Sequence, residues 1–235
     1  MNNNTIRLKI MQRLNKLSSR DYDNIECWQM VEAFNKAQLT WCRRQLHGMN
    51  KKQEGDEESK RRIDDLQVLL KDLPVTRFVT KDRYVEIETL PNDYFEYKRV
   101  SIKASIPECS NKRNMIVYLA EEGNLEILLK DENKKPSFPW GETFATLKGN
   151  KVLIYTNNEF TVNEGILVYY QLPRNIEITG CMNLTTGTIS TVDVESVFKD
   201  DIVELIIDEA AKIIAGDIES FNQQQIAGNE VESNN

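Results

Sequence analysis

The stretch FPWGETFATLKGNKVLIYTNNEFTVNEGILVYYQLP, residues 138–173, decides the fold class of the middle of this chain. Apolar and aromatic residues alternate along it, and the turn sequences KGNK, TNNE and VNEG interrupt the alternation. A period of two residues, broken by Gly and Asn, is typical of short strands joined by tight turns. The final run GILVYYQLP ends at a proline, as a strand at the end of a sheet does, and nothing near it offers a nucleophile, a metal ligand or a phosphate loop.

The same period of two extends over residues 75–189 and predicts one β domain. Lys and Glu at alternate positions indicate that one face of the sheet is exposed to solvent. Turns rich in Gly, Pro and Asn separate the runs, which is typical of a small antiparallel sandwich or barrel. The predicted strands cover residues 84–88, 98–104, 115–119, 125–129, 152–155 and 166–172.

Helical spacing replaces this period on both sides of the β domain. Residues 25–46 carry an apolar stripe that includes Phe34 and Trp41 and predicts a long helix. A second helix, ending near residue 73, is predicted to form an antiparallel hairpin with the first. The third helical segment, residues 198–217, is apolar around more than half of its circumference.

The wide apolar arc of this third helix must contact more than one neighbour. Ile202, Ile206 and Ile213 lie on the arc. The helix either fills the groove of the N-terminal hairpin within one chain or joins a second subunit. The sequence thus predicts an α+β protein: a helical hairpin or bundle closed by a C-terminal helix, with an inserted antiparallel β-sandwich or barrel domain.

The predicted domain boundaries follow these changes of period. They are 1–74 for the N-terminal helices, 75–190 for the inserted β domain, 191–216 for the C-terminal helix and 217–235 for a polar tail. The tail has no periodic apolar face and no lysine or arginine, so we expect it to be flexible.

Composition places the chain among water-soluble globular proteins. Of its 235 residues, 40% are hydrophobic and 29% are charged, and no apolar run approaches the roughly 18 residues of a membrane-spanning helix. The start MNNNTIRLKI lacks the apolar core and the small-residue cleavage site of a secretory leader. We therefore expect synthesis in a cytosol and no membrane partner.

Charge is distributed unevenly around a formal net charge of −7. Residues 1–53 hold ten Lys and Arg against four Asp and Glu, whereas residues 190–219 hold nine acids against two lysines. These oppositely charged ends are either solvated helix faces, or they attract each other or a neighbouring copy. An acidic chain without a basic stripe argues against tight, sequence-specific nucleic-acid binding.

Residues that could carry catalysis or bind a metal are scarce. The four cysteines are widely separated and form no C-x-x-C pair, so neither a disulfide nor a metal site is predicted. The single histidine, His47, precedes Gly48 and fits a helix C-cap. No Walker, Rossmann, zincin or nucleophile-elbow motif occurs, and the adjacent carboxylates at 64–65, 200–201 and 208–209 fit a solvated acidic face. We therefore predict no enzyme activity, no catalytic residue, no metal and no cofactor.

Aromatic residues in the β domain could stack nucleotides, as in single-strand binders. The candidates are Phe138, Trp140, Tyr155, Phe160, Tyr169 and Tyr170. The lysines that add modest local charge are Lys130, Lys134, Lys135, Lys148 and Lys151. Because the positive groove that must accompany such stacking is missing, packing in a core or an interface is the favoured interpretation.

The order of these elements, and several phrases within them, resemble a known family. The phrases are LPNDYFEYKRVSIKA, PSFPWGETF, KVLIYTNNEFTVNEGILVYYQLP and DIVELIIDEAAKIIAGDIES. Over about residues 20–220, the chain resembles the ring proteins of the head-to-tail connector in crAss-like, short-tailed bacteriophages. The helical hairpin with an inserted β domain also resembles the head–tail adaptors of short-tailed phages more broadly.

This resemblance implies a structural virion protein. It implies a homo-oligomeric ring, commonly of twelve copies in this family, stacked beneath the portal protein, where it lengthens the DNA channel and offers a platform for the adjacent tail ring. Genomic DNA would pass without specific binding, and the protein, made in the host bacterial cytoplasm, would reside in the virion. The alternating strands would then pack a β domain whose edges and loops meet neighbouring copies.

The same resemblance implies a binding partner for the polar tail. Phe221 and Ile226 are its apolar anchors and are expected to dock on the portal or on a neighbouring subunit. Two other classes of function remain as alternatives from the sequence. One is a monomeric nucleic-acid- or carbohydrate-binding β module, and the other is an enzyme with an unrecognised site.

Overall fold

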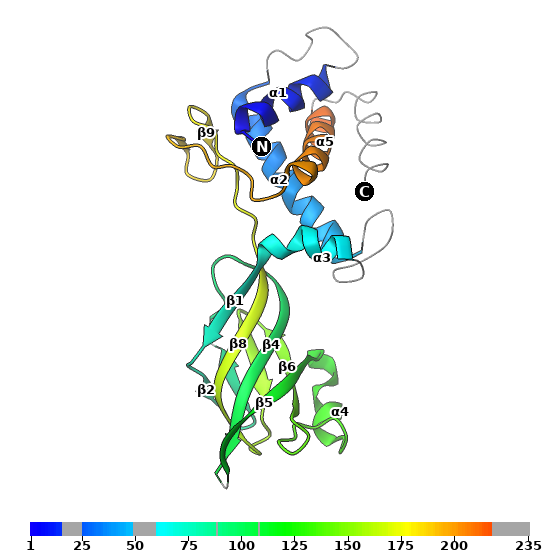
Figure 1. Ribbon diagram of the computed structural model, residues 1–235, viewed down its shortest axis with the longest axis vertical. Helices are drawn as coiled ribbons and strands as arrows, with labels where there is room; N and C mark the ends of the chain where they lie inside the picture. The colour runs from blue at the N-terminus through cyan, green and yellow to red at the C-terminus, as the bar shows by residue number, and fades with distance from the viewer. Residues whose placement is uncertain (16–24, 49–59, 88, 108, 218–235) are drawn as a thin grey trace. The chain divides into compact units, whose positions relative to one another are not determined.

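The computed structural model describes residues 1–15, 25–48, 60–87, 89–107 and 109–217 (Figure 1). The chain divides into two compact units. The helical unit comprises Met1–Leu69 and Pro173–Asn235, and the β unit comprises Leu70–Leu172. The mixed α+β class is confirmed. The β unit is shorter than the predicted 75–190 domain at its C-terminal end, because the chain returns to the helical unit at Pro173.

One curled sheet of eight strands forms the β unit, in the order β1-β8-β4-β5-β6-β7-β3-β2. The strands are β1 (Leu70–Val75), β2 (Val79–Thr80), β3 (Tyr84–Ile87), β4 (Tyr94–Ile106), β5 (Cys109–Leu119), β6 (Glu142–Lys148), β7 (Lys151–Tyr155) and β8 (Thr161–Gln171). Neighbouring strands are antiparallel except β5 and β6, which run parallel. The prediction of a purely antiparallel domain is wrong at this pair, because the 3-10 turn η2 (Glu122–Asn124) and the helix α4 (Leu125–Lys130) cross over between the two strands.

One face of the sheet carries the main core of the β unit. Val100 and Ile102 on β4 are buried, and the residues between and after them are less so. Leu167 and Tyr169 on β8 join the same apolar cluster. The period of two is therefore confirmed for β4, whereas on β8 the four consecutive residues 167–170 are all buried, so both faces of that strand are covered. The predicted turn at 162–165 is wrong, because these residues continue β8.

Residues 125–129, predicted as a strand, form most of the helix α4 instead. Its three leucines follow helical spacing and pack against the cluster of Phe144, Leu153 and Tyr155. Glu126 lies in the first turn, where the helix dipole favours an acid. A short apolar run fits both periods, so only the packing partner decides between strand and helix.

The predicted helix ending near residue 73 is also wrong in its last part. The helix α3 (Lys60–Leu66) and the 3-10 turn η1 (Gln67–Leu69) lead directly into β1. Leu70 pairs with Tyr170 in the sheet ladder, so strand pairing overrides the helical spacing of the leucines. The predicted hairpin of two long helices is consequently not confirmed.

Three helices form the core of the helical unit: α1 (Asn3–Leu14), α2 (Cys27–Leu46) and α5 (Asp200–Asp217). The helix α5 packs against both α1 and α2 (Figure 1). A capping box between Glu26 and Gln29 opens α2, and His47 closes it as the predicted C-cap. The C-terminal helix thus finds two neighbours within its own chain. None of the helices in the described ranges has the length and apolar character needed to cross a membrane.

A disulfide joins two parts of the helical unit. Cys27, at the start of α2, is bonded to Cys181, and their Cα atoms lie 5.6 Å apart. The prediction of no disulfide is wrong, because the two cysteines are 154 positions apart in the chain. Sequence spacing does not reveal a pair that only tertiary packing brings together.

Candidate functional site

A tight turn before β6 presents Trp140 to solvent. The Gly141 amide donates hydrogen bonds to the carbonyl oxygens of Ser137 and Phe138, at 3.0 and 3.1 Å. Ser137 and Glu142 form an isolated β-bridge that closes the turn. Phe138 packs against the core of the β unit, whereas Trp140 is 79% exposed. The turn therefore buries one aromatic ring and displays the other.

Gly141 and Arg113 hold this turn in place. Gly141 has φ +72°, which favours glycine, and a Cβ added there would lie 3.0 Å from the Arg113 Nε atom. The Arg113 guanidinium, on β5, donates from Nη1 to the carbonyl oxygens of Phe138 and Pro139, at 3.1 and 2.7 Å. The backbone that carries Trp140 is thus fixed both by its own hydrogen bonds and by a neighbouring strand.

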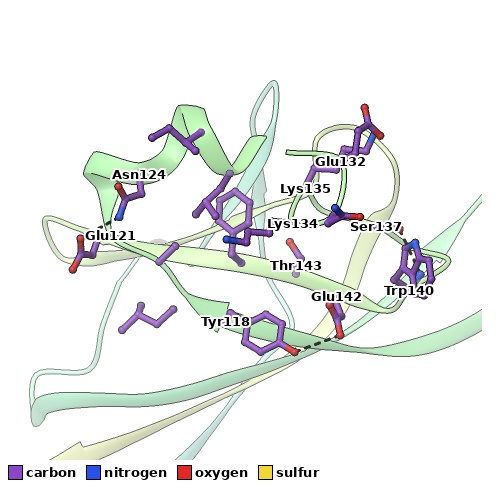
Figure 2. A pocket seen from close by; sticks show the side chains of 16 residues that line it. Tyr118, Glu121, Asn124, Glu132, Lys134, Lys135, Ser137, Trp140, Glu142 and Thr143 are labelled. Carbon is purple, nitrogen blue, oxygen red and sulfur yellow. Dashed lines mark hydrogen bonds and ion pairs between the residues drawn. The ribbon is translucent and has the colours of Figure 1, made fainter. Parts of the chain in front are cut away.

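A cleft of ≈ 660 Å³, which we call the aromatic cleft, lies beside this turn. The end of β5, the helix α4 and the start of β6 supply its walls (Figure 2). Its apolar lining consists of Tyr118, Leu119, Ile127, Leu128, Trp140 and Phe144. Tyr118, Leu119, Ile127 and Trp140 are all exposed. The volume lies in the range of ligand sites and several exposed apolar side chains lie together here, so this cleft is the candidate binding surface of the β unit.

Polar side chains stand at the edge of the aromatic cleft (Figure 2). The Tyr118 hydroxyl donates a long hydrogen bond to Glu142 Oε1, at 3.4 Å. Lys135 Nζ forms an ion pair of 2.7 Å with Glu132, and hydrogen bonding to that carboxylate raises the pKa of Lys135. Lys134 lies next to this pair and is exposed. The rim is therefore mixed in charge, with one cation of the loop already engaged.

The other aromatic residues considered for base stacking pack inward. Those that are buried are Tyr155, Phe160, Tyr169 and Tyr170. The favoured interpretation of core packing is confirmed for these four, and Trp140 is the exception. Two of the lysines considered with them, Lys148 and Lys151, line a separate cleft of ≈ 450 Å³. Tyr155 lines that cleft as well, whereas Trp140 lines the aromatic cleft with Lys134 and Lys135, so the candidate residues are divided between two clefts.

The sequence did not single out Tyr118 and Ile127. They lie on β5 and α4, more than ten positions from Trp140, and the crossover between β5 and β6 brings them to the same cleft. Tyr118 belonged to a predicted strand and Ile127 to a strand that proved to be a helix. The part of the site that the sequence does indicate is the phrase PSFPWGETF, residues 136–144, which forms the Trp140 turn.

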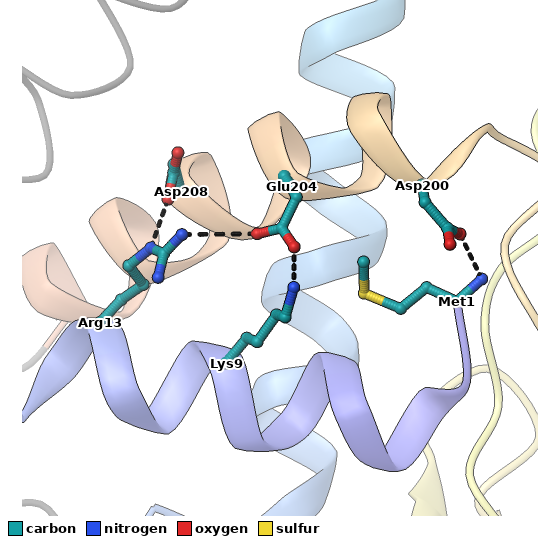
Figure 3. Close-up of polar contacts among 6 residues, drawn as sticks. All are labelled: Met1, Lys9, Arg13, Asp200, Glu204 and Asp208. Carbon is teal, nitrogen blue, oxygen red and sulfur yellow. Dashed lines mark hydrogen bonds and ion pairs between the residues drawn. The ribbon is translucent and has the colours of Figure 1, made fainter.

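The oppositely charged ends of the chain pair with each other inside the helical unit (Figure 3). The pairs are the Met1 amino group with Asp200, Lys9 with Glu204, Arg13 with Glu204 and Asp208, and Arg44 with Glu209. Arg13 Nε donates to Asp208 Oδ1 at 2.7 Å, and the Asp208 side chain is only 8% exposed. These charges are therefore paired between helices within one chain, which decides between the alternatives left open by the sequence for these residues.

The residues predicted to pack the helices are mostly buried within the helical unit. Four of the five are buried, namely Phe34, Trp41, Ile202 and Ile206. Trp41 meets Phe198 edge to face, with ring centroids 5.3 Å apart, whereas Ile213 is only partly buried. The two predicted anchors of the tail, Phe221 and Ile226, lie outside the described residues.

A second apolar surface, the apolar hairpin of residues 181–192, lies on the helical unit. It contains the short strands β9 (Met182–Asn183) and β10 (Thr188–Ile189). Its exposed apolar side chains are those of Met182, Leu184, Ile189 and Val192. The period of two that extends over residues 75–189 assigns most of this segment to the β domain, whereas in the structure it belongs to the helical unit, so the sequence does not predict this surface.

The base of the apolar hairpin is fastened to two helices. Asn3 Nδ2, on α1, donates to the carbonyl oxygens of Glu177 and Val194, at 2.7 and 3.1 Å. On α2, Asn35 Oδ1 accepts a hydrogen bond of 2.8 Å from the Ile176 amide, and the disulfide adds a covalent link. The hairpin thus has a fixed base and carries four exposed apolar side chains along its length.

Groups with potential chemical reactivity are few in the parts of the chain that the structure describes. There, no cluster of three or more His, Cys, Asp or Glu side chains could hold a metal ion. Burial raises the pKa of the Cys42 thiol to about 12, so the thiol stays protonated at neutral pH. No protein-family model matches the chain, and no curated protein matches it. A function for this chain therefore has to be inferred from the geometry of its surfaces and clefts.

Proposed function

We propose that this protein is a structural ring component of the head-to-tail connector of a bacteriophage. In that role it binds the portal protein, extends the DNA channel and offers a platform for tail assembly. The observation that carries the proposal is the Trp140 turn. The phrase PSFPWGETF resembles the connector ring proteins, and its residues form the turn that holds the exposed indole of Trp140 in place. A side chain that is held in place before binding loses little conformational entropy when a partner covers it.

The chemistry of the aromatic cleft supports a protein partner. Trp and Tyr are enriched among the residues that dominate the affinity of protein interfaces, and here they lie beside exposed aliphatic side chains. Because the backbone around Trp140 is already fixed, burying its ring costs little conformational entropy. Contact between copies in a ring, or with the next ring, would remove this surface from water.

The arrangement of charge supports a channel that DNA passes without binding tightly. The formal net charge is −7, and Arg13 and Arg44 are engaged by carboxylates of α5. A cation paired with a largely buried carboxylate is not available to neutralise a phosphate. Arg13 and Arg44 would therefore not hold duplex DNA, and the net negative charge of the chain repels phosphate.

The test is to image the purified full-length chain by electron microscopy, with and without portal-bearing heads, and to measure its mass in solution. We expect rings, of twelve copies if the resemblance extends to copy number, and attachment to the heads. Mass spectrometry of purified phage particles should detect the protein. A chain that stays monomeric beside portal-bearing heads, or that is missing from the particles, would contradict the proposal.

One observation favours a second candidate function, that of a carbohydrate-binding module. Trp140 and Tyr118 line the aromatic cleft together with the carboxylates of Glu121 and Glu142. An aromatic face can cover the apolar face of a sugar ring while carboxylates accept hydrogen bonds from its hydroxyls. A glycan array probed with the full chain and with Trp140→Ala separates the two candidates. Binding of a glycan that the variant loses would support this second function.

A further inference from the structure

We propose that the disulfide of Cys27 and Cys181 is a redox latch, a bond whose reduction releases the apolar hairpin from the start of α2. In the reduced chain the hairpin separates from α2 while the three core helices stay folded, and reoxidation fastens it again. The latch concerns the helical unit and is independent of the aromatic cleft. Only the time at which it closes rests on the proposed function.

The hydrogen bonds that hold this segment to the helices lie at its base. Asn3 donates to the carbonyl oxygens of Glu177 and Val194, and side chains of α2 bond to the backbone of residues 174 and 176. Among the described residues, the disulfide is the sole covalent or polar contact that joins residues 178–193 to a helix. The bond therefore controls the part of the segment beyond its base.

Without the bond, residues 178–193 have only their own hydrogen bonds to order them. Gly180 donates to the carbonyl oxygen of Ser190, and Ser190 donates to that of Cys181, each at 2.9 Å. The strands β9 and β10 have two residues each and pair only with each other. An isolated two-stranded ribbon is marginally stable in water, so this segment should fray once it is released.

The fastened hairpin covers part of α2. A cavity of ≈ 150 Å³ lies between them, lined by Trp28 and Val31 on α2 and by Ile178 and Met182 on the other side. Val31 and Ile178 are only 9% and 7% exposed. Release of the hairpin opens this cavity to solvent, so the reduced chain presents apolar side chains that the oxidised chain covers.

A small thiol can open the bond by ordinary exchange. Cys27 is partly exposed, whereas Cys181 is 7% exposed, so Cys27 is the more accessible partner. A thiolate such as that of glutathione attacks the Cys27 sulfur, and Cys181 leaves as a thiolate. A second thiolate attacks the mixed disulfide and releases Cys27. Two small thiols thus supply two electrons and two protons and leave as one disulfide, and the reverse exchange with a small-molecule disulfide closes the latch.

The proposed function determines when the latch closes. A virion protein is made in a reducing bacterial cytosol and is later released into an oxidising environment, where disulfides form and persist. The hairpin would therefore be free during assembly and fastened in released particles. Its four exposed apolar side chains would take fixed positions only in the mature protein.

The test is hydrogen exchange, measured by mass spectrometry, on the full-length chain in its oxidised and reduced forms. Peptides that contain the amides of Gly180 and Ser190 report on the hairpin, and peptides from α5 report on the core helices. The variant Cys181→Ser removes the latch permanently. Cys42→Ala is the matched control, because Cys42 also lies on α2 but is a free cysteine. Thermal melting checks that each variant is folded.

We expect reduction to speed exchange in the hairpin peptides at least tenfold, while the α5 peptides stay protected over the same labelling times. Cys181→Ser should exchange rapidly in the hairpin with or without reductant. Cys42→Ala should respond to reductant as the parent chain does. Oxidised glutathione should restore slow exchange in the reduced parent chain.

Two results would overturn the latch and leave the ring-forming function untouched. One is equal hairpin exchange in the oxidised and reduced chain. The other is loss of protection in α5 together with the hairpin, because the bond would then hold the whole helical unit together instead of one segment.

The time of closure is tested by alkylating free thiols in infected cells and in released particles, followed by mass spectrometry. We expect Cys27 and Cys181 to be alkylated in the cells and bonded in the particles. A bond that is already closed in the cells would overturn this timing. A protein that is missing from the particles would contradict the proposed function, while the exchange experiment would still decide on the latch.

Discussion

Gly141 decides how Trp140 is presented, because its φ of +72° is strained for any residue with a Cβ. Gly141→Ala should lower the free energy of unfolding by about 1–2 kcal/mol, and it should displace the Arg113 side chain that clamps the turn. Urea unfolding, followed by tryptophan fluorescence, measures the loss. Gly123→Ala is the control, since a Cβ there meets nothing within 4 Å. Equal losses in the two variants would show that the Gly141 turn is not strained.

Asp93 links three parts of the β unit through one carboxylate. Its Oδ2 accepts from Lys71 on β1 at 2.6 Å, and its Oδ1 accepts from the Tyr169 hydroxyl on β8 at 2.9 Å. The hydrogen bond from Lys71 is the main reason that the pKa of Asp93 is lowered. Burial, followed by the hydrogen bond to Asp93, raises the pKa of Tyr169 to about 12, so the hydroxyl remains a donor at neutral pH.

This lowered pKa makes a contribution to stability that depends on pH. A depressed carboxyl pKa stabilises the fold above the pKa of the unfolded chain, about 4, and the contribution is lost as pH falls through the folded value. Asp93→Asn should therefore destabilise the protein at pH 7, by less than about 1 kcal/mol because both partners are partly exposed. The gap to the parent in urea unfolding should narrow as pH falls below about 4, through the lowered pKa of folded Asp93. Asp72→Asn, at an exposed position on β1, is the control, and a gap that persists at low pH would contradict the assignment.

At the scale of elements, the sequence predicts secondary structure best where apolar residues recur with the period of a helix or strand and form one buried face. The stripe of Phe34 and Trp41 on α2 and the alternation on β4 were read correctly for this reason. The start of β1 and the helix α4 were not, because a short leucine-rich run fits either period and its neighbour decides. The candidate site shows the same difference. The Trp140 turn is formed by consecutive residues, whereas the walls of the aromatic cleft are brought together by the crossover between β5 and β6, which the spacing of residues in the sequence does not predict.

The contact of α1 with α5 contains a largely buried carboxylate that accepts a hydrogen bond from an arginine. Arg13→Leu leaves the Asp208 carboxylate, 8% exposed, without its 2.7 Å hydrogen bond from Arg13. We expect a loss of about 1–3 kcal/mol in urea unfolding, because the largely buried Asp208 carboxylate loses a charged donor, whereas the Arg13 side chain is 24% exposed. The double variant Arg13→Leu and Asp208→Leu should recover much of this loss. Lys103→Ala, from an exposed pair with Glu164, should cost less than about 1 kcal/mol, and a similar cost for Arg13→Leu would contradict the prediction.

The disulfide of Cys27 and Cys181 gives the helical unit a dependence on redox conditions. A cross-link of this kind typically contributes about 2–4 kcal/mol, so an added reductant should lower the melting temperature of the oxidised protein. Cys27→Ala should melt at the lower temperature with or without reductant. Differential scanning calorimetry measures both. Identical melting of the parent chain in the two conditions, with the bond verified by mass spectrometry, would show that the bond does not stabilise the fold.

At the scale of the whole molecule, the sequence identified an inserted β domain but misplaced its edges by ascribing 173–190 to it. The change from helical spacing to a period of two residues indicates the insertion, whereas its exact ends depend on which strands form the outer pairs of the sheet. Leu70 and Tyr170 are partners in neighbouring strands, so the chain enters and leaves the β unit at adjacent positions. This is the geometry of an independent insertion.

The β unit should accordingly fold when it is excised as residues 70–172. All eight strands of the sheet and its two apolar clusters lie within these residues, so no ladder or core is cut. Cooperative thermal unfolding, and hydrogen exchange that matches the same residues in the full chain, are the expected results. The fragment 75–172, which begins at the N-terminal boundary predicted from the sequence, lacks nearly all of β1 and exposes the edge of β8. It should be less stable and more prone to aggregate, because an uncovered strand edge pairs with other chains. An unfolded 70–172 fragment, or equal stability of the two, would show that β1 is not an integral strand of the β unit.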